Sequence, residues 1–152
     1  MSYWLLKTEP DEFSIDDLEA NKGAEMWDGI RNYQARNILR DDIQVGDKAL
    51  IYHSSCKNVG VAGVASVVRS AYPCPRQFKA SDKYFDEKST KDNPRWFVID
   101  VAFEEKFTSV LPLKQIKQEP TLSEMVLVRQ GRLSVQPVSA KEFNTIIRLA
   151  KQ

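Results

Sequence analysis

The chain has 152 residues, of which 42% are hydrophobic and 28% charged, and its formal net charge is +1 at pH 7. These values are typical of one soluble globular domain and exclude a disordered chain or a histone-like protein that binds nucleic acid by charge alone. No run of about 18 apolar residues could cross a membrane, and the apolar stretch at the N-terminus is too short for a secretory signal. We therefore expect a single cytoplasmic domain over residues 1–152.

The first elements are a strand and two short helices. Residues Tyr3–Thr8 are aromatic and apolar, which predicts a strand, and Ser14 is placed to cap a helix directly after it. A second short helix is predicted over residues 32–40. Asn32, Arg36 and Arg40 recur every four residues on one side of this helix, so that side is predicted to be polar and basic.

The middle of the chain predicts three strands, over residues 47–54, 59–68 and 95–106. Between the last two lies a polar stretch, residues 72–93, which contains prolines and many charges. We expect this stretch to form a long excursion over the barrel. Its length favours a functional lid or a binding loop over a simple connector.

The C-terminal part predicts a short helix after Pro112 and a capping box at residues 121–124. Residues 125–128 and 133–135 suggest two brief strands in a hairpin. The most secure helix begins at Ser139, because Ser139 and Glu142 form a capping box before a regular apolar repeat. Together the elements predict an α+β domain around a curved sheet.

Several kinds of catalytic or metal centre lack support in the sequence. The two cysteines, Cys56 and Cys74, form no CxxC pair, which argues against a structural zinc site and predicts free thiols, with Cys74 exposed or half-buried. His53 is the one histidine, and no glycine-rich phosphate loop is present. We therefore expect no cofactor and no metal.

Residues 26–37 hold the densest mixture of aromatic, amide and basic side chains. The face of Trp27 could stack on a nucleobase, and a neighbouring amide or carboxylate could pair with the edge of that base. A tryptophan before a helix is also a common core residue. The pattern by itself leaves both interpretations open.

Five blocks of the sequence resemble the EVE domain family, in family order and over essentially the whole chain. They are Tyr3–Pro10, Trp27–Asn37, Tyr52–Ser54, Asn93–Trp96 and Arg129–Val135. The resemblance, which is to the short stand-alone bacterial members, implies a PUA-like fold related to the YTH and ASCH domains. That fold is a mixed β pseudo-barrel flanked by short helices, and it agrees with the predicted elements.

The resemblance implies non-catalytic binding of a modified base, in DNA or RNA, by a monomer with an aromatic pocket. In that pocket Trp27 would form one wall, and Tyr33, Tyr52 or Trp96 would form the other, with no means of choosing among the three. The candidates for polar contacts with the edge of the base and at the mouth of the pocket are Lys7, Asp28, Asn32, His53 and Ser54. Asp28 could instead cap the following helix, Lys7 could be an ordinary solvated lysine, and His53 could be purely structural.

Arg36, Arg129 and Arg132 are the candidates for contacts with backbone phosphates, although surface ion pairs would explain them nearly as well. Two other functions remain open. The chain could be an enzyme for a small molecule or nucleotide that uses His53 with Asp28 or Glu9 as an acid–base pair. It could also be an adaptor whose excursion binds another protein.

Overall fold

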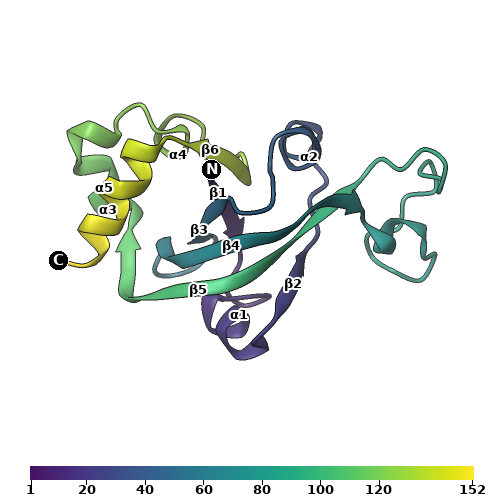
Figure 1. The fold of residues 1–152 in the computed structure, drawn as a ribbon, viewed down its shortest axis with the longest axis horizontal. Helices are drawn as coiled ribbons and strands as arrows, with labels where there is room; N and C mark the ends of the chain where they lie inside the picture. The colour runs from purple at the N-terminus through teal and green to yellow at the C-terminus, as the bar shows by residue number, and fades with distance from the viewer.

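The computed structural model describes residues 1–152 and contains one six-stranded sheet with short helices around it (Figure 1). The strands are β1 (Tyr3–Thr8), β2 (Ala24–Trp27), β3 (Lys48–His53), β4 (Gly60–Pro73), β5 (Phe97–Pro112) and β6 (Val135–Val138). The helices are α1 (Ile15–Asn21), α2 (Tyr33–Asp41), α3 (Leu113–Gln118), α4 (Val126–Arg129) and α5 (Ala140–Ala150). Short 3-10 turns cover Pro75–Phe78 and Pro120–Leu122.

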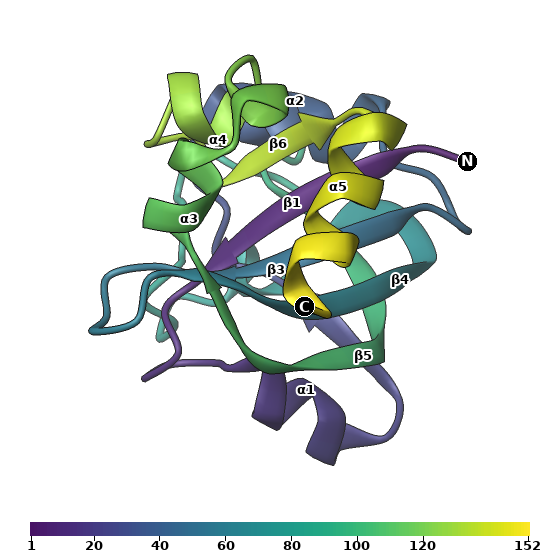
Figure 2. The same ribbon diagram turned by 90° about the vertical axis from the view of Figure 1, so that its left-hand side faces the viewer.

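The sheet is mixed and strongly curved (Figure 2). Its strand order is β2-β5-β4-β3-β1-β6, with β1 parallel to β3 and every other neighbouring pair antiparallel. The predicted α+β class, with a mixed, curved sheet flanked by short helices, is confirmed.

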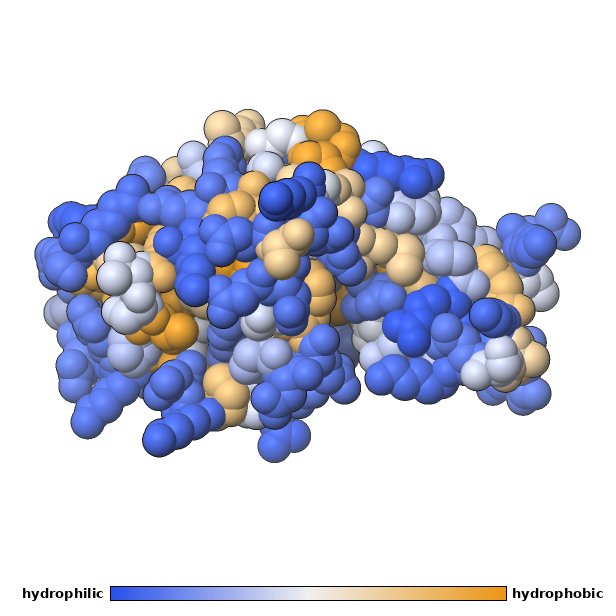
Figure 3. All heavy atoms as spheres, turned by 90° about the horizontal axis from the view of Figure 1, so that it is seen from below, coloured by the Kyte–Doolittle hydropathy of each residue, from blue (hydrophilic) through white to orange (hydrophobic).

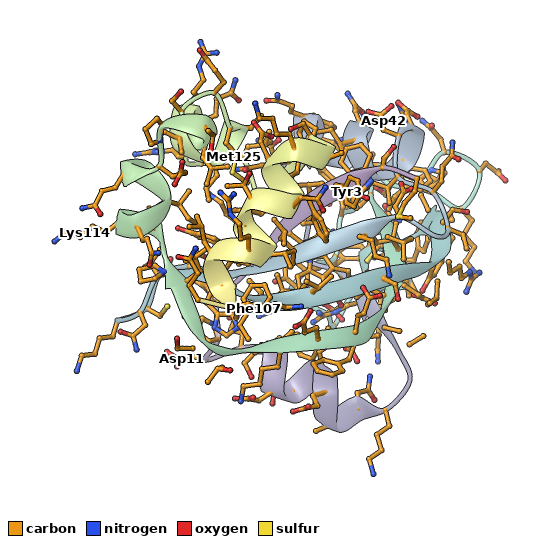
Figure 4. The ribbon with its side chains drawn as sticks, turned by 60° about the vertical axis from the view of Figure 1, so that its left-hand side comes forward. Tyr3, Asp11, Asp42, Phe107, Lys114 and Met125 are labelled. Carbon is orange, nitrogen blue, oxygen red and sulfur yellow. The ribbon has the colours of Figure 1, made fainter.

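The two faces of the central strands enter two separate cores. Along β1, Trp4 and Leu6 belong to a core that also contains apolar residues of α1 and α2. Leu5, between them, faces the other core, which α3, α4 and α5 cover. Tyr3 packs on Phe143 of α5 with 4.3 Å between ring centroids, and Figure 4 shows it beside that helix.

Several predicted elements differ from the structure. The predicted hairpin over residues 125–135 is wrong, because residues 126–129 form α4 and Val135–Val138 pairs with β1 instead. The capping box at residues 121–124 does not form either, because Thr121 lies inside the 3-10 turn Pro120–Leu122 and its hydroxyl donates to the carboxylate of Glu119. A short apolar run fits a helical turn as well as a strand, and its tertiary partners decide between them.

The excursion of residues 72–93 also differs from its prediction, because it extends from the end of the long β4–β5 hairpin rather than over the barrel (Figure 1). It is nevertheless an ordered loop. The buried amide of Gln77 donates to the carbonyls of Cys74 and Trp96 and accepts from the N–H groups of Arg95 and Trp96. These bonds join the start of the loop to its end. Cys74 is a free thiol, as predicted, but it is fully buried, so the prediction of an exposed or half-buried thiol is wrong.

Asp47 ties the start of β3 to the N-terminus. Its buried carboxylate accepts hydrogen bonds from the backbone N–H groups of Ser2 and Gln44 at 2.9 Å each and from the indole N–H of Trp4 at 2.8 Å. Burial by itself raises the pKa of Asp47, but the three hydrogen bonds outweigh burial and hold this pKa below its ordinary value.

The lowered pKa of Asp47 predicts how stability depends on pH. Because the folded state favours the charged form, Asp47 stabilises the protein above the unfolded-state pKa of about 4, and this contribution is lost as pH falls through the folded-state pKa. We expect Asp47→Asn to lower the free energy of unfolding by about 2 kcal/mol at pH 7, and the deficit to shrink toward pH 3. Urea denaturation at several pH values measures both effects. Asp92→Asn is the control, because Asp92 is exposed and its side chain makes no hydrogen bond or ion pair. A deficit in Asp47→Asn that is constant with pH would contradict this role.

Candidate nucleic-acid interface

An open cleft of about 420 Å³ lies where β1, β2 and the excursion meet. This volume is within the range of roughly 300–1,000 Å³ that small-molecule sites occupy. Figure 3 shows the surface indented between the main body and the lobe that the excursion forms. The lining residues are Lys7, Thr8, Glu12, Phe13, Glu25, Met26, Trp27, Asp28, Arg76, Lys83 and Tyr84.

Trp27 serves both the core and the cleft. Its side chain is only 5% exposed and belongs to the core that β1, α1 and α2 share, yet part of it lines the cleft. The ring of Phe13 meets the indole edge-on, at 5.9 Å between centroids and an interplanar angle of 87°. The interpretation of Trp27 as a core residue is therefore confirmed, and the indole also forms the floor of the cleft more than a free wall. Stacking of a base on it stays a prediction.

Tyr84 brings a third aromatic ring to the cleft, from the excursion. The guanidinium groups of Arg76 and Arg31 lie 4.5 and 4.9 Å from the centroid of its ring. Gly29, with φ of +83°, lies against it, and a Cβ added there would be 3.1 Å from the tyrosine hydroxyl. Glycine at position 29 thus permits both the left-handed backbone and the approach of Tyr84.

Charges of both signs line the cleft. The Arg76 guanidinium donates to Asp82 at 2.8 Å and to Oδ2 of Asp28 at 3.0 Å, so it links the excursion to the end of β2. These bonds raise the pKa of Arg76 and lower the pKa of Asp82. Burial, with the nearby carboxylates of Asp28 and others, raises the pKa of Glu25.

Lys7 connects the cleft to a second hollow. Its Nζ donates to the carbonyl of Gly131, and burial lowers its pKa. Gly131 belongs to a hollow of about 250 Å³ that Asn32 and Arg132 also line. The side chain of Asn32 caps α2 by accepting from the N–H of Ala35 at 3.0 Å.

The cleft unites three of the predicted site residues, Lys7, Trp27 and Asp28, while the other candidates lie elsewhere. None of the three rings proposed to face Trp27 lines the cleft. Tyr52 is buried in the core under α3 to α5, whereas Tyr33 and Trp96 stack on each other outside the cleft at 5.0 Å between centroids. Tyr52 is separated from Trp27 because alternate residues of a strand point to opposite faces of the sheet. Tyr52 enters the core under α3 to α5, whereas Trp27 belongs to the core on the opposite face.

Two more predicted residues lie at the end of β3, away from the cleft: His53 is the last residue of the strand, and Ser54 follows it. Nε2 of His53 accepts the backbone N–H of Ile15 at 3.1 Å, so its neutral form carries its proton on Nδ1. Burial lowers the pKa of His53, although Asp16 acts in the opposite direction. No carboxylate bonds to His53, so its predicted acid–base pair with Asp28 or Glu9 is not assembled. Ser54 donates its N–H to the carbonyl of Thr8.

The proposed phosphate contacts have different surroundings. Arg129 pairs with the exposed Glu124 at 2.8 Å, whereas Arg36 bonds only to the carbonyl of Arg95 and the amide oxygen of Asn37. Sequence reasoning missed Phe13, Arg76 and Tyr84 as cleft residues. The length of the excursion was the one feature of the sequence that could have indicated Arg76 and Tyr84. No local sequence pattern indicated Phe13.

Comparison with known proteins gives a consistent family. The model of the EVE domain matches residues 2–149. Human thymocyte nuclear protein 1 is 38% identical over 169 aligned residues, which cover 99% of this chain and 75% of the relative.

Solved structures show the same fold. A hypothetical protein from Leishmania major superimposes with a TM-score of 0.94 at 49% identity, covering 99% of this chain and 94% of the other. Human THYN1 protein in complex with 5-methylcytosine-containing DNA superimposes with a TM-score of 0.94 at 38% identity, covering 100% and 99%. A YTH domain from Zygosaccharomyces rouxii is similar in fold alone, with a TM-score of 0.57 at 14% identity, covering 99% of this chain and 86% of the other.

None of the helices is long and apolar enough to span a bilayer.

The bonds of Arg76 to Asp28 and Asp82 are expected to hold the excursion in place beside the cleft. In Arg76→Gln we expect faster hydrogen exchange at the amide of Tyr84, because Asp82, which accepts that N–H, loses its guanidinium partner. The free energy of unfolding should change by less than about 1 kcal/mol, since these ion pairs are partly solvated.

Lys91→Gln provides the matched control, because Lys91 is an exposed cation of the same excursion whose side chain makes no hydrogen bond or ion pair. Equal exchange rates in Arg76→Gln and the unmodified protein would show that Arg76 does not hold the loop.

Proposed function

The chain belongs to the EVE domain family, and on that premise we propose that it binds nucleic acid without catalysis by holding a modified base in the cleft beside Trp27. The first candidate for that base is 5-methylcytosine in DNA. The observation that carries the proposal is the cleft itself, where Trp27, Phe13 and Tyr84 surround a space next to a carboxylate and a lysine. The 38% identical human THYN1 structure, which contains 5-methylcytosine DNA, supports the choice of ligand.

The aromatic residues would supply shape. A flat base fits between rings, and stacking against aromatic side chains is a common means of holding an unstacked base. Because little of Trp27 is exposed, we assign it the floor, with Tyr84 and Phe13 as the sides. The base must leave its stack to enter, so the ligand is an extruded or an unpaired nucleotide.

The polar residues would read the edge of the base. Arg76 engages only Oδ2 of Asp28, which leaves Oδ1 able to accept a hydrogen bond from the exocyclic amine of cytosine. The ammonium of Lys7 can donate to a base carbonyl or to a phosphate. A methyl group that becomes buried contributes about 0.8 kcal/mol, which corresponds to about fourfold in affinity.

Phosphates of the bound strand would lie outside the cleft. Arg132 lines the adjoining hollow and Arg36 has no carboxylate partner, so both can meet a phosphate without breaking an ion pair. Arg129 is less suited because Glu124 already neutralises it. We also propose that residues 1–152 act as one domain.

Binding of labelled oligonucleotides, followed by fluorescence anisotropy, tests the function. We expect an oligonucleotide with one 5-methylcytosine to bind about fourfold or more tightly than the same sequence with cytosine. Asp28→Asn should reduce this affinity because an amide oxygen accepts more weakly than a carboxylate, and Tyr84→Ala should reduce it by loss of the ring. Trp27→Ala is unsuitable, since removing a buried indole costs about 3–5 kcal/mol of stability.

The control is Lys114→Gln, which changes an exposed charge on α3, at the opposite end of the molecule from the excursion (Figures 1 and 4). Its affinity should equal that of the unmodified protein. Equal affinities for the methylated and unmethylated strands, unaltered in Asp28→Asn and Tyr84→Ala, would refute the proposed function.

A further inference from the structure

Aromatic and guanidinium groups form a continuous row from the cleft to the start of α2. Arg31 lies over two rings, with its guanidinium carbon 4.9 Å from the centroid of Tyr84 and 5.3 Å from that of Trp96. Trp96 in turn stacks on Tyr33 at 5.0 Å and an interplanar angle of 26°. The Arg36 guanidinium lies 4.9 Å from the centroid of Tyr33 and ends the row.

Tyr33, near the outer end of this row, is 51% exposed. Its orientation is nevertheless fixed, because Trp96 beneath it is buried and donates its indole N–H to Asp86 at 2.8 Å. The packing of the core does not use the exposed part of Tyr33. Trp96 covers one face of this rigid ring and the Arg36 guanidinium also lies over the ring, so a base must stack on the face away from Trp96 and either share it with that guanidinium or displace it. Aromatic faces and guanidinium planes are both surfaces on which bases stack.

The charge beside Tyr33 is positive. Arg36 donates to the carbonyl of Arg95 at 3.0 Å and to the side-chain oxygen of Asn37, both neutral acceptors. Nη1 of Arg95 lies 3.5 Å from the Tyr33 hydroxyl and 3.9 Å from Asp86, so its charge is partly balanced. An exposed ring next to an arginine whose charge is not paired suits a base followed by its phosphate.

We propose that Tyr33 and Arg36 form a second nucleic-acid contact, on which an unpaired base one or two nucleotides from the modified base stacks. This inference rests on the proposed function of the cleft. A base within a duplex has both faces covered by its neighbours, so the ligand is a strand that is unpaired at that position as well as at the modified base. The protein therefore recognises a short single-stranded segment rather than one extruded base in an otherwise intact duplex.

Single-stranded DNA oligonucleotides that carry one central 5-methylcytosine provide the test. An abasic site is placed in turn at each of the two positions on either side of the modified base. We expect one of these abasic strands to bind the unmodified protein roughly tenfold more weakly, and Tyr33→Ala to bind the intact strand more weakly by a similar factor. Because both changes remove the same contact, that abasic site should cost Tyr33→Ala nothing further.

Two pairs of variants separate stacking from general effects. Tyr33→Phe keeps the ring and should bind the intact strand as tightly as the unmodified protein. Arg36→Gln should weaken binding, whereas Arg40→Gln, on the same helix but paired with Asp41 at 2.8 Å, should not. Thermal melts followed by circular dichroism confirm that each variant is folded.

The outcomes distinguish this inference from the function on which it rests. If Tyr33→Ala binds the intact strand normally, or if its effect adds to that of every abasic site, the Tyr33 contact is overturned while the cleft can still prefer the methylated strand. If the unmodified protein binds no oligonucleotide, the proposed function fails and this inference fails with it.

Discussion

The candidate site depends on the unequal lengths of the strands. β4 and β5 have 14 and 16 residues, whereas the other strands have four to six, so the β4–β5 hairpin continues beyond the sheet. Its far end carries the excursion to a place beside β2, where Arg76 bonds to Asp28. Without this extension of the hairpin, the cleft would keep its floor at Trp27 and the side formed by Phe13, but it would lack the side formed by Tyr84. The hydrogen bonds of Gln77 keep the excursion closed on itself, and so Tyr84 has a fixed place.

The floor of the cleft is made from the core. Trp27 lies at the end of β2, where its neighbours on the buried side are the residues that hold α1 and α2 against the sheet. A ring placed in this way cannot rotate freely, which reduces the entropy that binding must offset. The same placement would couple the proposed recognition to stability, because a change in the indole alters the core as well as the floor of the cleft. Residues on the rim, such as Asp28 and Tyr84, can change with less effect on the core.

Electrostatics in this molecule act locally. The net charge is only +1, and both acidic and basic groups line the cleft, so a uniform long-range attraction for polyanions is weak. Most arginines near the cleft and α2 instead lie over aromatic rings, namely Arg31, Arg36, Arg40 and Arg76. Such stacking holds each guanidinium in one orientation while its N–H groups stay available for hydrogen bonds. The protein is thus suited to recognise the shape and edges of a ligand more than its total charge.

Local patterns determined much of the fold. The helices at Ser14, Asn32 and Ser139 begin where a capping side chain precedes an apolar repeat. Strand β1 has the bounds that its aromatic and apolar residues predict. These signals depend on neighbours a few positions away. Only the tertiary structure decided that residues 126–129 are helical and that Tyr84 rather than Tyr33, Tyr52 or Trp96 shares the cleft with Trp27. The sequence indicated Trp27 as a possible wall of a pocket. Which ring lies across from it depends on where the excursion, residues 72–93, places Tyr84. That place follows from contacts between residues far apart in the chain, and no local periodicity records them.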